Sequence, residues 1–155
     1  MSLELFGHSF SSYTWKALIA LYENATPFAF RMLGPDHANN YAKLVSLWPV
    51  GKFPLLLDGA TEVVEASTII EYLELFHPGP VKLIPDDPAT AIEVRMLDRI
   101  FDNYVMNIMQ VFVNKAINPD EVTAASVSKA GGALDTIYAY LNSRIAGRAW
   151  AAGDA

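Results

Sequence analysis

The sequence predicts an α/β domain with a mixed four-stranded sheet, followed by an all-α region with two long helices. Three observations carry this prediction. Short strand-like runs alternate with helical segments in the first half of the chain, a proline-rich stretch interrupts the middle, and helical periodicity occupies the second half. The predicted boundaries are 1–77 for the first domain, 78–88 for a linker and 89–155 for the helical region.

The beginning of the chain predicts a strand, a helix and a second strand. Residues 3–6 form a short apolar run, and the next segment has an apolar stripe at the helical spacing i, i+3, i+4, i+7. The members of this stripe are Trp15, Leu18, Ile19 and Tyr22. Asn24 is the expected end of the helix, and Pro27 introduces a strand over 28–32. Because so short a strand–helix–strand unit requires a crossover, the two strands are predicted to be parallel.

The strongest local signal lies in residues 54–64. Asp58 and Gly59 separate two strand-like runs, and this dipeptide is typical of a two-residue hairpin turn, in which both central positions need positive φ. The polar segment before the hairpin carries one short helix around 41–47. After the hairpin, a helix over about 66–76 is expected to bury its apolar positions, Ile69, Ile70, Leu73 and Phe76.

Four of the nine prolines of the chain lie within residues 77–88, a stretch that neither continues a helix nor alternates like a strand. Asp87 or Thr90 is expected to cap the first long helix, which ends at a loop over 118–120. The apolar stripe of that helix is Leu97, Ile100, Phe101, Tyr104, Val105, Ile108, Met109 and Phe112. The second long helix is marked by Leu134, Ile137, Tyr138, Leu141 and Ile145.

Composition and charge exclude several classes of function. The chain has no cysteine, which excludes a disulfide scaffold, a Cys-ligated zinc site and a disulfide exchanger. Its net charge of -6 argues against binding to nucleic acids or anionic membranes. No apolar run of membrane-spanning length and no signal peptide are visible, so we expect a cytoplasmic protein. His8, His37 and His77 lack metal-ligand spacing, so no metal site is expected.

Two adjacent serines mark the first candidate site, between the first predicted strand and the helix that follows it. Ser11 and Ser12 precede the first predicted helix, whose N-terminal amides and partial positive charge suit a bound anion or thiolate. A serine hydroxyl at this place can donate one further hydrogen bond to the anion. The alternative is an ordinary helix cap.

Two further junctions are candidates for peptide recognition. If Pro54 is in the cis form, the backbone of Phe53 is exposed to an extended peptide ligand; the alternative is a trans proline that simply begins a strand. At Glu65, Ala66 and Ser67, backbone amides suit a carboxylate, while the Glu65 side chain suits an ammonium group. Here too the alternative is helix capping.

These residues resemble the cytosolic glutathione S-transferase family. Residues 3–32 are similar to its opening segment, most closely to the bacterial and zeta/theta-like branches with an active-site serine. Residues 51–54 resemble its cis-proline segment, and residues 65–73 resemble its γ-glutamyl-binding motif. The motifs have the order and spacing of the family. The resemblance implies a thioredoxin-like N-terminal domain, an all-helical C-terminal domain and a homodimer.

The resemblance also implies roles for single residues. Ser11 matches the serine that hydrogen-bonds the glutathione sulfur, and Ser12 is the neighbour that can substitute for it. Phe53 matches the residue whose backbone pairs with the cysteinyl part of glutathione, with Pro54 in the cis form. Glu65 matches the acidic residue that contacts the γ-glutamyl end.

The γ-glutamyl motif departs from the family pattern. Ala66 stands where the family normally has a serine, so the hydroxyl donor to the γ-glutamyl carboxylate is lost. Such a hydrogen bond is worth roughly 1.5–3 kcal/mol, which lowers affinity by about ten-fold or more. Ser67 faces a different direction on the helix. Lys52 is the implied contact of the glycyl carboxylate, helped by His37 or Asn39.

The resemblance predicts a glutathione transferase, in which glutathione is the co-substrate and its thiolate attacks a small electrophilic, apolar substrate. The implied walls of the second-substrate pocket are Tyr104, Ile108, Met109 and Phe112. Residues 149–155 match the stretch before the next helix of the family, so we expect a helical domain that is only partly present. The alternatives are a non-catalytic binding or assembly module of the same fold, and a glutathione-dependent isomerase.

Overall fold

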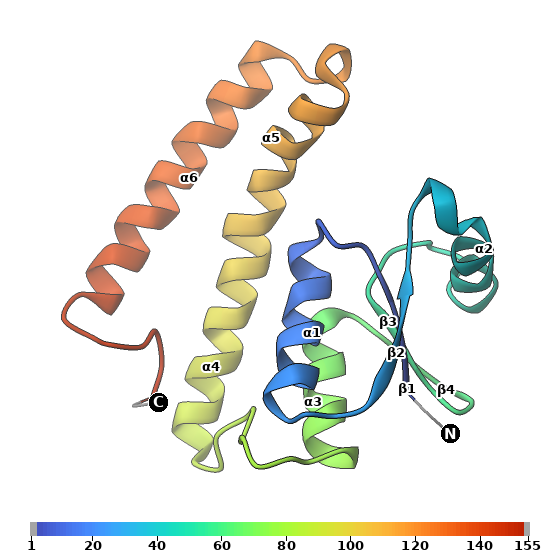
Figure 1. Ribbon diagram of the computed structural model, residues 1–155. Coiled ribbons are helices and arrows are strands. Elements are labelled where there is room, and N and C mark those ends of the chain that lie inside the picture. Colours follow the sequence, from blue (N-terminus) through green and yellow to red (C-terminus); the bar gives the residue numbers. More distant parts are fainter. Residues whose placement is uncertain (1–2, 154–155) are drawn as a thin grey trace. The chain divides into compact units, whose positions relative to one another are not determined.

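A computed structural model describes residues 3–153 of the chain (Figure 1). These residues form two compact units, and the boundary between the units lies between Ile84 and Pro85, inside the proline-rich stretch. None of the helices found in the described residues combines the length and the hydropathy that a membrane-spanning helix needs.

The first unit is built on a mixed four-stranded sheet. Its strands are β1 (Leu3–Gly7), β2 (Phe28–Met32), β3 (Leu55–Asp58) and β4 (Thr61–Val64), in the spatial order β2-β1-β3-β4. The pair β1 and β2 is parallel, as the short crossover predicts, and the other two pairs are antiparallel. The predicted sheet is therefore confirmed.

Helices cover both faces of this sheet. α1 (Ser12–Glu23) and α3 (Ala66–Phe76) lie on one face, and α2 (Ala38–Leu47), preceded by the 3₁₀ turn η1 (Pro35–His37), lies on the other (Figure 1). Successive side chains of a strand point to opposite faces, so each strand supplies two cores. Leu5 belongs to the core under α1 and α3, whereas its neighbour in the chain, Phe6, belongs to the core under α2.

Three of the four residues in the apolar stripe of α1 are exposed, whereas Leu18 packs against the core. Trp15, Ile19 and Tyr22 are 55%, 60% and 68% exposed. The buried positions of α1 are Thr14, Ala17, Ala20 and Leu21. Small side chains let the helix approach the sheet closely, and Gly7 of β1 shows how closely, because an added Cβ would lie 2.4 Å from the Thr14 side chain. The stripe identified the helix but not its buried face. In α3, Phe76 was likewise expected to be buried, but its side chain is 63% exposed.

The hairpin turn lies one residue later than predicted. Asp58 still pairs with Thr61 in the ladder, so the central residues are Gly59 and Ala60. Gly59 has a φ of 61° and Ala60 has no positive φ, which fits a turn that needs a left-handed residue only at its first central position. Asp58 stays in the strand, where its carboxylate is bound by two side chains of the following helical segment.

Those two side chains belong to Tyr72 and His77. The Tyr72 hydroxyl donates to Asp58 Oδ2 over 3.0 Å, and His77 Nε2 lies 2.7 Å from the same oxygen. The hydrogen bond from His77 lowers the pKa of Asp58, burial opposes this shift, and the bond from Tyr72 adds to it. The Asp58 carboxylate thus joins the β3–β4 turn to the end of α3.

This lowered pKa predicts how stability depends on pH. A carboxyl whose pKa is lower in the folded chain stabilises the fold above its unfolded pKa, and the contribution is lost as pH falls through the folded pKa. We therefore expect the urea midpoint of the first unit to fall as pH drops below about 4. Asp58→Asn should remove part of this fall, whereas Glu62→Gln, at an exposed position of the neighbouring strand β4, should not. Equal pH profiles for Asp58→Asn and the unaltered chain would contradict the prediction.

The predicted end of α1 at Asn24 is confirmed, and its side chain also holds the linker. Asn24 Nδ2 donates to the Val81 carbonyl over 2.9 Å, and the Val81 N–H donates to Asn24 Oδ1 over 2.7 Å. Gly79 passes so close that an added Cβ would lie 2.4 Å from the Asn24 side chain. The proline-rich stretch is therefore tied to α1 by a pair of hydrogen bonds that imitates a β-ladder.

The second unit is helical. Its elements are α4 (Pro88–Ile100), the π-helical segment η2 (Phe101–Met106), α5 (Asn107–Ile117), the 3₁₀ turn η3 (Pro119–Glu121) and α6 (Ala124–Ile145). The first predicted long helix thus contains α4, η2 and α5, which run on without a break in Figure 1. The second predicted long helix is α6.

Asp87 caps the first long helix, because its carboxylate accepts the Thr90 N–H over 2.8 Å. Arg144 and Arg148, at and just beyond the end of α6, both contact the Glu93 carboxylate of α4, over 3.0 and 3.1 Å. The π-helical segment was not predicted, because a π turn leaves the apolar periodicity almost unchanged over so short a distance.

Candidate functional site

The register of the sheet brings four loops to one edge. Gly7 pairs with Met32 where the parallel strands β1 and β2 end. Phe6 pairs with Leu55 at the beginning of β3, and Leu55 pairs with Val64 at the end of β4. The segments that follow β1, β2 and β4, and the segment that precedes β3, therefore all leave the sheet at the same edge.

These loops contain the site residues that were predicted in the first domain, and the N-termini of α1 and α3 lie at the same edge. Two helix N-termini concentrate unpaired amide N–H groups and partial positive charge there. The structure thus brings together the following predicted residues: Ser11, Ser12, Lys52, Phe53, Pro54, Glu65, Ala66 and Ser67.

Ser11 is the N-cap of α1. Its Oγ accepts the Thr14 N–H over 3.2 Å, and its backbone is extended, with φ -92° and ψ 118°. Capping uses the hydroxyl oxygen as an acceptor and leaves the hydroxyl hydrogen available for donation. Ser11 can therefore cap the helix and donate to an anion at the same time. Ser12 is the first residue of α1 and is half-buried.

His8 lies in the loop before Ser11, in a position that the sequence did not single out. Its Nδ1 accepts the Phe10 N–H over 3.2 Å, so a neutral ring carries its proton on Nε2. The centroid of the His8 ring is 6.3 Å from that of Phe53, which joins the β1–α1 loop to the segment before β3. No spacing pattern in the sequence links these two residues, because the contact depends on the register of the sheet.

The Phe53–Pro54 peptide bond is cis, as the resemblance implied. Pro54 is buried and Phe53 is half-buried. Phe53 lies just outside the ladder in which Leu55 pairs with Phe6 and Val64. Phe53 therefore lies next to the end of the sheet without being part of β3.

Glu65 has the most unusual backbone of the site. It occupies the N-cap position of α3 with φ 69° and ψ 120°, a conformation that disfavours a residue with a side chain. Its exposed side chain makes no capping hydrogen bond. Capping, the simpler alternative for this junction, therefore does not describe Glu65. Strain of this kind clusters at functional sites, and the carboxylate remains available to a cation.

The two residues after Glu65 turn inward. Ala66 and Ser67 are both buried. Ser67 Oγ accepts a hydrogen bond from Lys16 Nζ of α1 over 3.2 Å. The Ser67 hydroxyl therefore joins α3 to α1.

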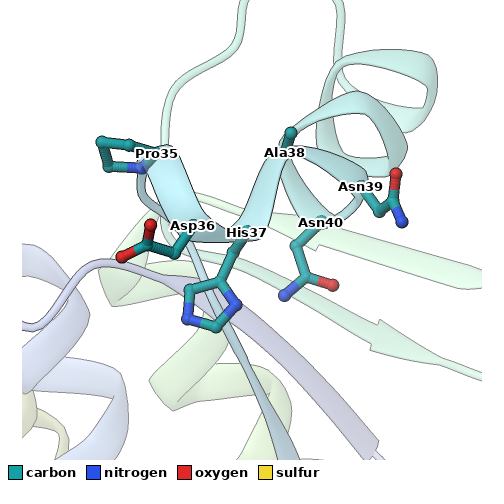
Figure 2. Close-up of a pocket in the computed structure, with 6 residues that line it drawn as sticks. All are labelled: Pro35, Asp36, His37, Ala38, Asn39 and Asn40. Atoms are coloured by element: carbon teal, nitrogen blue, oxygen red, sulfur yellow. The ribbon is translucent and has the colours of Figure 1, made fainter.

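The loop after β2 lines a cavity of about 360 Å³. Figure 2 shows its wall, in which Asp36, His37 and Asn40 point to the same side of the segment while the Asn39 side chain points away from them. Lys52 is exposed and has no ion-pair partner among residues 3–153. The edge of the sheet thus offers a cation and a polar cavity in addition to the two helix N-termini.

The remaining predicted residues lie in the second unit. Tyr104 belongs to η2 and is exposed, whereas Ile108, Met109 and Phe112 belong to α5 and are half-buried. In the part of the chain that the structure describes, no three His, Asp or Glu side chains are arranged to hold a metal ion.

Comparisons with known proteins agree with this fold. Residues 5–81 match the family model described as "Glutathione S-transferase, N-terminal domain". A protein of Caenorhabditis elegans named "Probable maleylacetoacetate isomerase" is 26% identical over 117 residues, which are 76% of this chain and 54% of that protein. The "Uncharacterized GST-like protein YibF" of Escherichia coli (strain K12) is 28% identical over 145 residues, which are 90% of this chain and 70% of that protein.

One solved structure extends the similarity to the whole chain. A glutathione S-transferase of Methylobacterium radiotolerans, in complex with glutathione sulfonate, has a TM-score of 0.81 and 27% sequence identity. The alignment covers 100% of this chain and 72% of that one. The chain is thus shorter than these relatives, and it spans little more than half, 54%, of the length of the nematode protein.

Proposed function

Since the chain belongs to the cytosolic glutathione S-transferase family, we propose that it binds glutathione and transfers it to a small electrophilic, apolar substrate. The observation that carries the proposal is the double role open to Ser11. It caps α1 through its oxygen and keeps its hydroxyl hydrogen for a sulfur anion at the helix N-terminus.

Each part of the tripeptide has a proposed contact. The cysteinyl backbone pairs with the N–H and C=O of Phe53, and the sulfur accepts a hydrogen bond from Ser11. The γ-glutamyl ammonium group is bound by Glu65, and its carboxylate by the backbone amides that begin α3. Lys52 binds the glycyl carboxylate, with His37 as the second polar contact. The glutathione sulfonate bound by the Methylobacterium relative supports glutathione as the ligand.

The proposed chemistry depends on ionising the thiol. A free thiol has a pKa near 8.5, so only a few per cent is thiolate at neutral pH. The positive end of α1 and the Ser11 hydroxyl both favour the charged form and lower this pKa. The thiolate then attacks an electrophilic carbon, a C–S bond forms, and the leaving group departs with the bonding electron pair. Tyr104, Ile108, Met109 and Phe112 are proposed to contact the apolar substrate.

We propose further that the protein works in the cytoplasm and as a homodimer, as expected for this family. A second candidate function is a binding module without catalysis. Ala66 favours it, because the missing hydroxyl weakens the hold on glutathione. A glutathione-dependent isomerase is the third candidate, and the similarity to the nematode isomerase favours it.

Calorimetric titration with glutathione, followed by a conjugation assay with an activated aryl halide, tests the proposal. We expect binding and conjugation. Absence of heat at millimolar glutathione would overturn the proposed function. Binding without conjugation would favour the module, unless a cis–trans isomerisation assay on an unsaturated diketo acid is positive.

Because Ala66 lacks the hydroxyl that would contact the γ-glutamyl carboxylate, restoring a serine at this position is expected to increase the affinity for glutathione. Ala66→Ser should tighten glutathione binding by about ten-fold or more, because a new hydroxyl donates to the carboxylate of the ligand. Ala89→Ser is the control, since it adds a hydroxyl near the N-terminus of a different helix, α4, and should leave the dissociation constant unchanged. An unchanged or weaker affinity of Ala66→Ser, measured by the same titration, would contradict the prediction.

A further inference from the structure

The N-terminal half of α2 has little apolar anchorage. Leu44 is the single buried residue that the structure assigns to this helix, and it belongs to the core that contains Phe6 and Leu55. Residues 38–43 and the preceding turn η1 are exposed or half-buried. The segment that lines the cavity, Pro35–Asn40, is thus held in place mainly by polar contacts.

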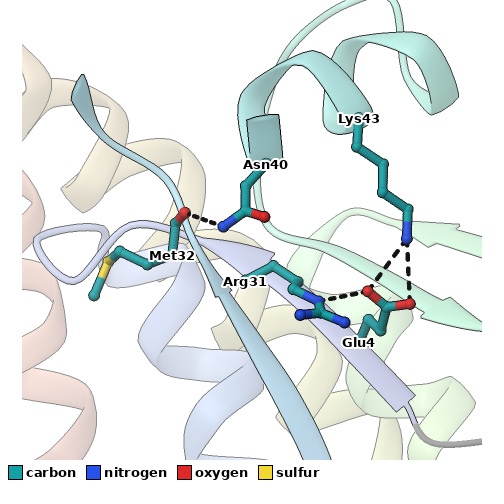
Figure 3. Close-up of polar contacts among 5 residues, drawn as sticks. All are labelled: Glu4, Arg31, Met32, Asn40 and Lys43. Atoms are coloured by element: carbon teal, nitrogen blue, oxygen red, sulfur yellow. Dashed lines mark hydrogen bonds and ion pairs between the residues drawn. The ribbon is translucent and has the colours of Figure 1, made fainter. Parts of the chain in front are cut away.

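Figure 3 shows two such contacts. Asn40 Nδ2 donates to the Met32 carbonyl over 2.8 Å, which joins the first turn of α2 to the end of β2. One turn further along the helix, Lys43 Nζ lies 3.2 Å from both carboxylate oxygens of Glu4 in β1. The same Nζ lies 5.3 Å from the centroid of the Phe6 ring.

The alternation of β1 explains why Lys43 meets both groups. Glu4 and Phe6 are two residues apart, so their side chains stand on the same face of the sheet, the face that α2 covers. A carboxylate and the face of an aromatic ring both attract an ammonium group. Lys43 therefore anchors α2 to β1 through two side chains at once.

Glu4 carries a second cation. Arg31 Nε of β2 donates to Glu4 Oε2 over 2.6 Å. This hydrogen bond lowers the pKa of Glu4, burial opposes the shift, and Lys43 adds to it. The carboxylate therefore stays ionised at neutral pH and holds both cations. Of the two, only Lys43 belongs to α2, and this makes Arg31 a natural control.

We propose that Lys43 is a positioning residue for glutathione. It acts through Glu4 and Phe6, which hold the middle of α2 and, through the first turns of this helix, the cavity wall that carries His37. The inference rests on the proposed function, in which this wall contacts the glycyl end of glutathione. The ion pair between Lys43 and Glu4 is partly exposed, with 45% of the Lys43 and 19% of the Glu4 side chain accessible. Removing it should therefore weaken the affinity for glutathione only modestly, by about two- to five-fold.

The test compares Lys43→Gln with Arg31→Gln. Both variants remove one cation from the same carboxylate. Lys43→Gln should raise KM and the dissociation constant for glutathione by about two- to five-fold with kcat unchanged, and it should speed amide exchange in residues 35–43. Arg31→Gln should leave KM, the dissociation constant and the amide exchange of residues 35–43 unchanged. Lys43→Arg keeps the positive charge and the contact with the Phe6 ring. Its affinity for glutathione and its amide exchange should therefore equal those of the unaltered chain.

The outcomes separate this inference from the proposed function. If the unaltered chain does not bind glutathione, the proposed function fails, and the role of Lys43 fails with it, whatever the exchange data show. If the unaltered chain binds, but Lys43→Gln equals Arg31→Gln in affinity, only the inference is overturned. Faster exchange in Lys43→Gln without a change in affinity also overturns it, since Lys43 would then stabilise α2 without positioning the ligand.

Discussion

Replacing Ser11 with alanine is expected to lower kcat for conjugation by about 10- to 100-fold and to raise the pKa of bound glutathione by about one to two units. The Ser11 hydroxyl is the proposed donor to the thiolate, and a hydrogen bond to a charged group is worth roughly 1.5–3 kcal/mol. The thiol pKa is read from thiolate absorbance across a pH series of the complex, and kcat from the conjugation assay.

Ser11 is also a helix cap, so its two roles must be separated. Losing the cap to alanine costs about 0.5–2 kcal/mol of stability, whereas glycine costs only a few tenths. Ser11→Gly should therefore lose as much turnover as Ser11→Ala while remaining more stable in urea. Ser12→Ala tests the neighbour and should keep most of the activity. An unchanged thiol pKa in both Ser11 variants would remove Ser11 from the mechanism, and a large loss in Ser12→Ala would assign the role to Ser12.

Changing Glu65 is expected to weaken glutathione binding by about ten-fold or more, because the ligand's ammonium group loses a charged acceptor. The backbone of Glu65 allows a sharper test. Glycine adopts positive φ without a steric penalty, so Glu65→Gly should stabilise the chain by about 1 kcal/mol while it weakens binding. Glu65→Gln keeps a side chain in the same strained backbone, so it should weaken binding without that gain in stability.

Urea unfolding and calorimetric titration of the two Glu65 variants provide the comparison. If Glu65→Gly is more stable but binds glutathione more weakly, the strained backbone at position 65 costs stability while the carboxylate it carries contributes to binding. If Glu65→Gly is less stable than the unaltered chain, the strain argument fails. If Glu65→Gln binds glutathione as tightly as the unaltered chain, the proposed ammonium contact fails.

Most element boundaries could be predicted because they depend on local chemistry. Asn24 ends α1, the strand Phe28–Met32 follows Pro27, and the helix Ala66–Phe76 begins directly after a strand. Each of these boundaries depends on turn residues and periodicity within a few positions. The hairpin turn was misplaced by one residue because Asp58 is held in its strand by side chains that lie many residues away in the chain.

Which face of a helix is buried could not be predicted when both faces are apolar. Trp15 and Ile19 form the larger stripe of α1, yet Ala17 and Leu21 face the sheet. Side-chain size favours the first pair, while close packing against a neighbouring strand favours the second. The sequence pattern contains no information about how near that strand will come.

The sequence alone determined which residues are candidates for the site, because Ser11, Pro54 and Glu65 each stand at a junction with recognisable chemistry. Tertiary structure decided how they are arranged. The register of β1, β3 and β4 brings them to one edge of the sheet. It also places Lys43 over Glu4, a contact between residues 39 positions apart in the chain. Such contacts depend on how strands pair and helices dock, and no local pattern of residues encodes that geometry.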